Sequence, residues 1–153
     1  MDLRTRIQNE TKDAMRARDS LRLSTLRLIS AAIKDREIAT RSAEGETKPM
    51  DEADLVAILA RMVKQRQESA RAYEEGGRLE LAEKEQAEIA VIEEFLPRQM
   101  SAAEVQAAIE AVIAELDATS VRDIGRVMAA LKARHAGQMD FGAAGAVVKQ
   151  KLL

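Results

Sequence analysis

Apolar residues recur at steps of three and four along most of the chain, which is the spacing that gathers side chains on one face of an α-helix. Turn-forming and capping residues separate one such run from the next. In the first part of the chain the pattern predicts four helices: residues 2–18, residues 20–40, a third from Asp51 to Gly76-Gly77, and residues 78–95. It predicts three more after that: residues 102–117, a helix from Ser120 to about His135, and a last one capped by Asp140.

The second predicted helix is apolar on two faces. One stripe is formed by Leu26, Ile29 and Ile33, and the other is formed by Leu21, Leu28 and Ala32. A helix of this kind is usually surrounded by other helices, so we expect it to be buried at the centre of a bundle. Gly45 and Pro49 then mark a polar loop over residues 41–50.

A break between two groups of helices falls at Pro97. Proline has no backbone N–H and disfavours the helical region for the residue before it, so the fourth helix must end here. Ser101 stands three residues before Glu104, the spacing of a capping box that begins the next helix. We therefore predict two domains, residues 1–96 and residues 97–153, joined near Leu96-Pro97.

Composition supports an all-α fold. Apolar residues make up 46% of the chain, charged residues 33% and aromatic residues only 2%. The absence of cysteine excludes disulfides and thiolate metal sites. No apolar run approaches the roughly 20 residues of a membrane span, and there is no signal-peptide core. We expect a cytoplasmic protein that does not bind membranes.

Charge is distributed unevenly along the chain. Residues 1–41 hold ten Lys and Arg against six Asp and Glu, residues 42–96 hold seven against fourteen, and residues 120–153 hold six against two. The basic C-terminal part supplies candidate phosphate-binding residues, namely Arg122, Arg126, Lys132, Arg134, Lys149 and Lys151. Because there are so few aromatic side chains on which bases could stack, contact with nucleic acid would be made through its phosphate backbone and its overall shape. The same cations could instead pair with the acidic middle of the chain or form an ordinary polar surface.

Catalytic and metal-binding patterns are absent from the sequence. His135 is the only histidine, so a zinc site or a histidine-dependent triad would lack partners, and a structural role at a helix end is expected. The carboxylates of residues 80–94 alternate with Arg78 and Lys84, which favours a solvated helix face over an acid–base or Mg²⁺ site. We predict no catalytic residues, no metal and no cofactor.

Two groups of segments resemble the sequence motifs of a known protein family. The first comprises Lys64-Gln-Arg-Gln-Glu-Ser69, Tyr73, Gly77-Arg78, Leu81-Ala82, Lys84-Glu85, Glu88-Ile89 and Phe95-Leu96-Pro97. The second is Asp123-Ile-Gly-Arg-Val-Met128. The first group resembles the signature of YqeY-like proteins. The second resembles the segment that this family shares with the tail of GatB, a subunit of the glutamine-dependent amidotransferase that corrects mischarged tRNA.

This resemblance implies an all-α fold of two unlike bundles, four helices and then three, and a tail that contacts tRNA. The family pattern carries over onto Asp123, Gly125, Arg126, Val127, Met128, Gly137 and Asp140. Of these, only Arg126 looks available to bind a ligand, because the others suit core, cap or close-packing roles. Nothing in the chain resembles the catalytic part of GatB.

We therefore predict an accessory module that contacts tRNA through its C-terminal bundle and has no catalytic site of its own. The expected partner is tRNA or an enzyme that handles aminoacyl-tRNA, and no DNA partner is expected. One alternative, implied by the family, is a component with carbon–nitrogen ligase activity that uses glutamine as the amide donor. The other is a protein–protein interaction module that docks through the acidic helices of residues 80–94.

Overall fold

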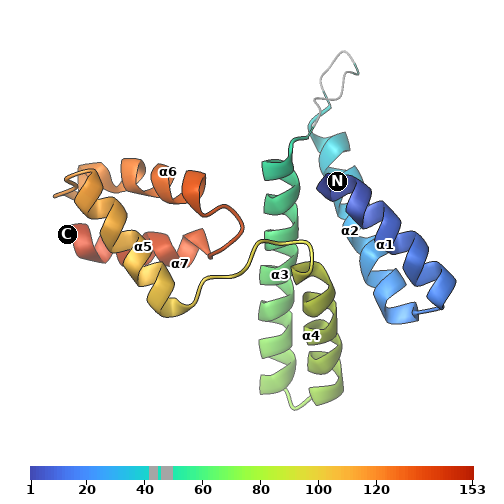
Figure 1. Cartoon of the computed structure of the whole chain (residues 1–153). Helices are drawn as coiled ribbons and strands as arrows, with labels where there is room; N and C mark the ends of the chain where they lie inside the picture. Colours follow the sequence, from blue (N-terminus) through green and yellow to red (C-terminus); the bar gives the residue numbers. More distant parts are fainter. Residues whose placement is uncertain (42–44, 46–49) are drawn as a thin grey trace. The chain divides into compact units, whose positions relative to one another are not determined.

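The structure, a computed structural model, describes residues 1–41, residue 45 and residues 50–153. Within those residues the chain is helical and contains no strand, which confirms the all-α prediction (Figure 1). It divides into two compact units, Met1–Leu96 and Pro97–Leu153. Most of the polar loop predicted over residues 41–50 lies outside the described residues.

In its described residues the first unit contains four α-helices, as the periodicity predicts. Their bounds are α1 Leu3–Ala17, α2 Ser20–Ala39, α3 Glu52–Glu75 and α4 Leu79–Glu93. Three of them begin at an aspartate whose carboxylate accepts a backbone N–H that the helix leaves without a partner. Asp2 accepts from Thr5 at 2.7 Å, Asp19 from Arg22 at 3.1 Å and Asp51 from Asp54 at 2.9 Å.

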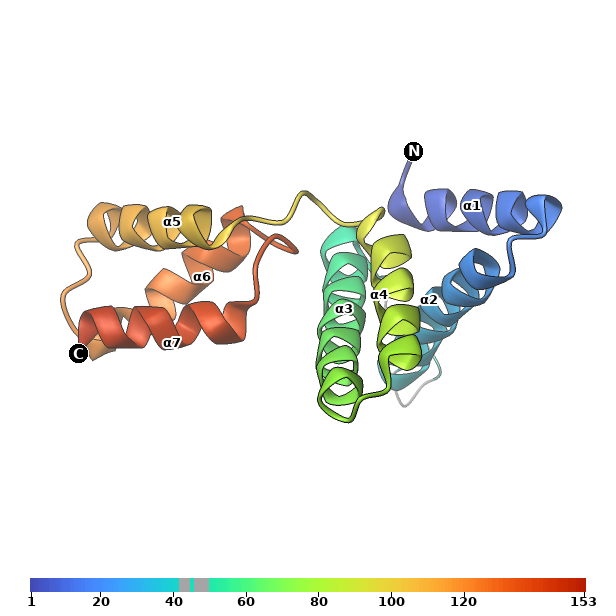
Figure 2. The same ribbon diagram turned by 90° about the horizontal axis from the view of Figure 1, so that it is seen from below.

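Helices α3 and α4 form an antiparallel hairpin around Gly76-Gly77. Gly77 has φ 74°, a left-handed conformation that glycine adopts without the strain a Cβ would cause. The backbone N–H of Arg78 then donates to the carbonyl of Tyr73 at 2.8 Å and closes the turn. Helix α4 packs against both α3 and α2, and α1 packs mainly against α2 (Figure 2). Leu26, Leu59 and Ile92 are fully buried where these helices meet.

The prediction of a centrally buried α2 is wrong. Leu26, Ile29 and Ile33 lie in the core as expected, but Leu21 and Leu28 are 40% and 44% exposed. The neighbours of α2 cover only one side of it, since α1, α3 and α4 all contact the face that carries the first stripe. Leu21 and Leu28 of the second stripe therefore face solvent, whereas Ala32 is partly buried and packs against the core of the unit.

A second correction concerns the acidic residues of α4. Glu88 is not on a solvated face: it is 8% exposed, and its carboxylate accepts from Arg66 Nε on α3 at 2.9 Å. Arg66 also donates from Nη1 to the carbonyl of Met62 at 3.3 Å. Beyond Met62 the buried apolar residues of α3 are Val63 and Ala70, and this part of the helix also contributes Arg66 to the ion pair.

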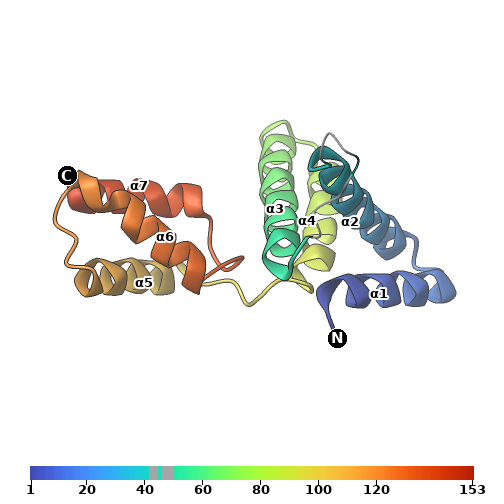
Figure 3. The same cartoon turned by 90° about the horizontal axis from the view of Figure 1, so that it is seen from above.

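The second unit contains α5 Ala102–Glu115, a 3₁₀ turn η1 Val121–Asp123, α6 Ile124–Arg134 and α7 Phe141–Leu152 (Figure 3). Its core is formed by fully buried aliphatic side chains from all three α-helices: Ile109, Val112, Val127, Leu131 and Val148. The predicted capping box is present, because Ser101 Oγ accepts from the N–H of Glu104 at 3.2 Å while Glu104 Oε1 accepts from the N–H of Ser101 at 3.1 Å.

The residues directly after Pro97 form hydrogen bonds with the turn that precedes α7 in the second unit. The N–H of Met100 donates to the carbonyl of Gln138 at 2.9 Å, and the side chain of Gln99 donates to the carbonyl of Gly137 at 2.6 Å. The side chain of Gln138 returns a hydrogen bond to the carbonyl of Arg98 at 3.1 Å. Gly137 has φ 74° and is buried in this turn, so a glycine is favoured there.

Candidate nucleic-acid interface

The six cations predicted to bind phosphate all lie in the second unit. Arg122 is on η1. Helix α6 carries Arg126, Lys132 and Arg134, and helix α7 carries Lys149 and Lys151. Helix α6 turns Val127 and Leu131 into the core, and η1 contacts α7. The candidates therefore lie around the solvent side of one small bundle, but they do not form a single uniform group.

Three of the six are held by carboxylates. Arg126 pairs with Asp123 at 2.8 Å and also donates to the carbonyl of Leu116 at 3.2 Å. The other two pairs reach from α6 and α7 to α5: Arg134 with Glu115 at 2.6 Å, and Lys151 with Glu110 at 3.4 Å. The guanidinium of Arg126, whose side chain is 56% exposed, links the start of α6 to the end of α5, so Arg126 is not the least engaged of the six cations.

The remaining three cations have no ion pair within the described part of the chain. Arg122, Lys132 and Lys149 are all exposed. At about 100° per residue, Lys132 lies about 140° around α6 from the buried Val127, which places it on the solvent side. Arg122 lies on the turn that touches α7, the helix that carries Lys149. These three residues, Arg122, Lys132 and Lys149, are called the free cation group below.

Carboxylates of the chain accept the backbone N–H groups at the starts of η1 and α7. Asp123 accepts from the N–H groups of Thr119 at 2.9 Å and Ser120 at 3.2 Å. These bonds, led by that of Thr119 and joined by the Arg126 guanidinium, lower the pKa of Asp123 to about 2. Asp140 accepts from Gly142 and Ala143 in the same way at α7. Because these N–H groups already donate to Asp123 and Asp140, they are not available to bind phosphate.

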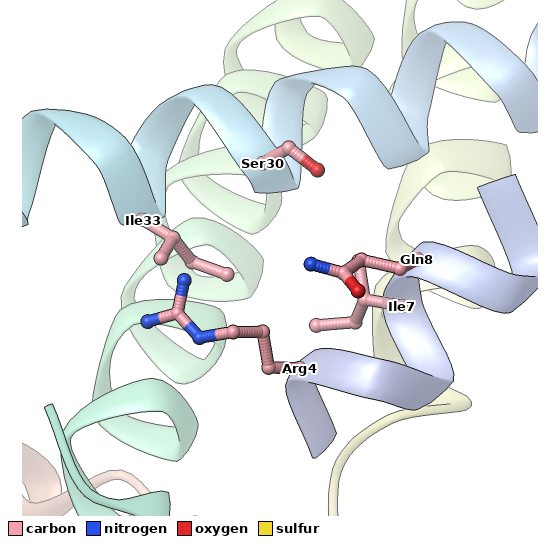
Figure 4. Close-up of a pocket in the computed structure, with 5 residues that line it drawn as sticks. All are labelled: Arg4, Ile7, Gln8, Ser30 and Ile33. Carbon is pink, nitrogen blue, oxygen red and sulfur yellow. The ribbon is translucent and has the colours of Figure 1, made fainter. Parts of the chain in front are cut away.

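A pocket for a small molecule and a metal site are the other kinds of site to consider. A pocket of about 100 Å³ between α1 and α2 is lined by Arg4, Ile7, Gln8, Ser30 and Ile33 (Figure 4). It is much smaller than the roughly 300–1,000 Å³ of sites for small organic ligands, and Arg4 is already paired with Glu37. Among the described residues, no three His, Asp or Glu side chains come together as a metal site would require.

His135 follows the last residue of α6 and is half-buried there. Its backbone N–H donates to the carbonyl of Leu131 at 2.9 Å, and its carbonyl accepts from Gln138 at 3.0 Å. These backbone bonds place His135 at a helix end, as predicted. In the described part of the chain, every helix is too short or too polar to span a lipid bilayer.

Comparison with known proteins settles the family. The model of the Yqey-like protein family matches residues 4–152, which is nearly the whole chain. The chain belongs to the YqeY-like protein family. This confirms the first of the two resemblances, and it extends over both units of this YqeY-like protein.

Similar curated proteins come from fungi. Altered inheritance of mitochondria protein 41 of Eremothecium gossypii is 33% identical over 120 residues, which cover 77% of this chain and 63% of that protein. The protein of the same name from Lachancea thermotolerans is 30% identical over 118 residues, covering 76% and 60%. An uncharacterized protein of Schizosaccharomyces pombe is 29% identical over 100 residues, covering 65% and 76%. The chain thus matches less than two thirds of the length of the first two relatives.

The relatives from Eremothecium gossypii and Lachancea thermotolerans contradict the expected cytoplasmic location, because they are named as mitochondrial proteins. The expectation rested on missing secretory and membrane-spanning signals. Those signals separate secreted and membrane proteins from others, but they do not separate the cytoplasm from the interior of a mitochondrion.

Proposed function

We propose that this YqeY-like protein is an RNA-binding accessory module that contacts tRNA through its second unit and has no catalytic site of its own. The observation that supports this most strongly is the free cation group, since Arg122, Lys132 and Lys149 are exposed and have no carboxylate partner among the residues that the structure describes. When an exposed cation without an internal partner contacts a phosphate, it displaces counterions from the nucleic acid. The release of these counterions drives binding.

The composition of the unit favours backbone recognition. Phe141 is the only aromatic residue within residues 97–153, and it packs against the core of the unit. A base would have no exposed ring on which to stack, so contacts with phosphate and with the shape of a folded RNA are favoured. Three carboxylates already bound to Arg126, Arg134 and Lys151 keep the surface from being strongly positive. We therefore expect modest affinity and strong dependence on salt.

The resemblance of residues 123–128 to the tail of GatB supports tRNA as the RNA. It also supports a role beside an enzyme that handles aminoacyl-tRNA. The chain's own residues give no basis for amide transfer, because Asp123 and Asp140 are engaged in capping and Arg126 is paired with Asp123. Any amidotransferase activity would belong to the partner enzyme.

The test is binding of fluorescently labelled tRNA, measured by anisotropy, to the wild type and to a triple variant with Arg122→Glu, Lys132→Glu and Lys149→Glu. The three residues are exposed, so the variant should keep its helical circular dichroism. We expect its affinity to fall by about tenfold or more, because three phosphate contacts are lost and replaced by repulsion.

A matched control changes three exposed cations of the first unit, Arg61, Arg71 and Lys84, to Glu. This control alters the net charge by the same amount but leaves the second unit intact, so it should bind tRNA nearly as well as the wild type. Equal losses in both variants would mean that net charge, and not this surface, determines binding. Absence of tRNA binding by the wild type would refute the proposal.

A further inference from the structure

Charge in the second unit is sorted by helix. Helix α5 carries three carboxylates, Glu104, Glu110 and Glu115, and no Lys or Arg. Helix α6 carries three cations and α7 carries two, and neither helix contains Asp or Glu. A row of phosphates is repelled by α5 and attracted by α6 and α7, so the sides of this unit are unequal towards RNA.

The two lysines of the free cation group point away from α5. Each stands two residues before a cation that is paired with an α5 carboxylate: Lys132 before Arg134, and Lys149 before Lys151. Two residues turn a helix by about 200°, so each lysine lies nearly opposite the flank that faces α5. The paired cations and the free lysines are therefore on different sides of the unit.

The same lysines flank the contact between α6 and α7. A Cβ built on Gly145 would lie 3.7 Å from Cε of Met128, so these two residues face each other. Lys132 lies one turn after Met128 on the same face of α6, and Lys149 stands in the same way after Gly145 on α7. Arg122 joins them because η1 packs against both helices. The free cation group thus lies along one side of the unit, called the α6–α7 side below.

The side chains beside the two lysines favour RNA over a protein partner. Ala129 and Ala146 are exposed and lie one turn before Lys132 and Lys149. Neither alanine is the aromatic or large side chain that anchors a protein interface. Cations among small side chains instead allow a phosphate backbone to come close.

We propose that RNA lies along the α6–α7 side and that α5 stays exposed to solvent in the complex. The free cation group binds the phosphates, and the carboxylates of α5 keep the other side of the unit clear of RNA. This inference rests on the proposed function, since it assigns the side of the second unit through which that function acts.

The first test adds carboxylates to one side or the other without changing a cation. Ala129→Glu with Ala146→Glu places two negative charges beside the free lysines, whereas Ala107→Glu with Ala111→Glu adds the same charge at exposed positions of α5. At about 0.15 M salt, exposed charges are screened beyond roughly 8 Å, so position matters more than net charge. The first variant should bind labelled tRNA about tenfold more weakly than the wild type, and the α5 variant within about twofold of it.

The second test maps the covered side directly, because the chain has no cysteine of its own. Ala129→Cys and Ala111→Cys are each labelled with a maleimide, without tRNA and with saturating tRNA. Bound RNA should slow the reaction of Ala129→Cys several-fold and leave that of Ala111→Cys unchanged. These small, uncharged substitutions report the covered side even if a double Glu variant folds poorly.

Equal weakening by the two double variants, or equal protection of the two cysteine positions, would overturn the assignment of RNA to the α6–α7 side and leave RNA binding itself standing. Unchanged tRNA binding by Ala129→Glu with Ala146→Glu would also overturn it and would leave this side to an acidic protein. A wild type that binds no tRNA would refute the proposed function and this inference together, so the two failures are distinguishable.

Discussion

Replacing Glu88 with alanine isolates the ion pair between α3 and α4. The carboxylate of Glu88 and the guanidinium of Arg66 are 2.9 Å apart, with side chains 11% and 15% exposed. Removing one member of a buried pair leaves the other charge without its partner, which costs about 3–5 kcal/mol. Because Arg66 keeps its hydrogen bond to Met62 and some contact with water, we expect the lower end, about 3 kcal/mol.

For a unit of this size, 1 kcal/mol shifts the melting temperature by roughly 4–8 °C, so Glu88→Ala should lower the Tm of the first unit by about 12–24 °C. Tyr73 lies on α3, and the chain contains no other tyrosine and no tryptophan. Intrinsic fluorescence therefore reports unfolding of the first unit alone. Urea unfolding followed at this tyrosine gives the free-energy change.

Two comparisons make the result specific. Glu83→Ala removes an exposed carboxylate from the same helix and should change stability by about 0.5 kcal/mol or less. The double variant Arg66→Met with Glu88→Leu replaces the pair by apolar side chains and should be near neutral or more stable than the wild type. A loss below about 1 kcal/mol for Glu88→Ala, or a double variant as unstable as the single one, would refute the reasoning.

Three further outcomes are expected in the second unit. Gly137→Ala should destabilise it by about 1–2 kcal/mol, since φ is 74° there and a Cβ strains that conformation, and thermal unfolding by circular dichroism measures the loss. Ser101→Ala should cost about 1 kcal/mol in urea unfolding through loss of the α5 cap. The pKa of Asp123 and the pKa of Glu104 are each lowered to about 2, the first chiefly by the Thr119 N–H and the second chiefly by Arg98. The stability that these two ionised carboxylates give to the folded unit is complete above the unfolded-state pKa of about 4 and is lost as pH falls towards 2. Asp123→Asn should therefore flatten the acid dependence of stability in a circular-dichroism titration.

Helix positions were predictable because their signals are local. Capping residues such as Asp2, Ser101 and Asp140 stand directly before the helices that they begin, and Pro97 and Gly77 stand where helices end. Each of these signals acts within a few residues, so periodicity and capping chemistry find them without knowledge of the fold.

The errors arose where a side chain's partner lies far away in the sequence. Glu88 looked solvated because Arg66, 22 residues earlier, becomes its neighbour only when the hairpin forms. Arg134 looked available because Glu115 meets it only after α5 and α6 pack together. The pairing of Arg126 with Asp123 spans three residues, and this one could have been found as an i,i+3 pair on a helix surface.

The second stripe of α2 shows a different limit. The pattern identified two apolar faces correctly, but a pattern on one helix does not say how many neighbours cover it. Leu21 and Leu28 therefore stay exposed although their spacing is that of a buried face.

The dependence of tRNA affinity on salt tests the central claim most directly. Three phosphate contacts predict a slope of log K against log salt of roughly −2 to −3 for the wild type. The triple variant at Arg122, Lys132 and Lys149 should lose most of that slope, while the control at Arg61, Arg71 and Lys84 should keep it. A wild-type slope near zero, or a slope that the triple variant leaves unchanged, would contradict the assignment of this surface to RNA.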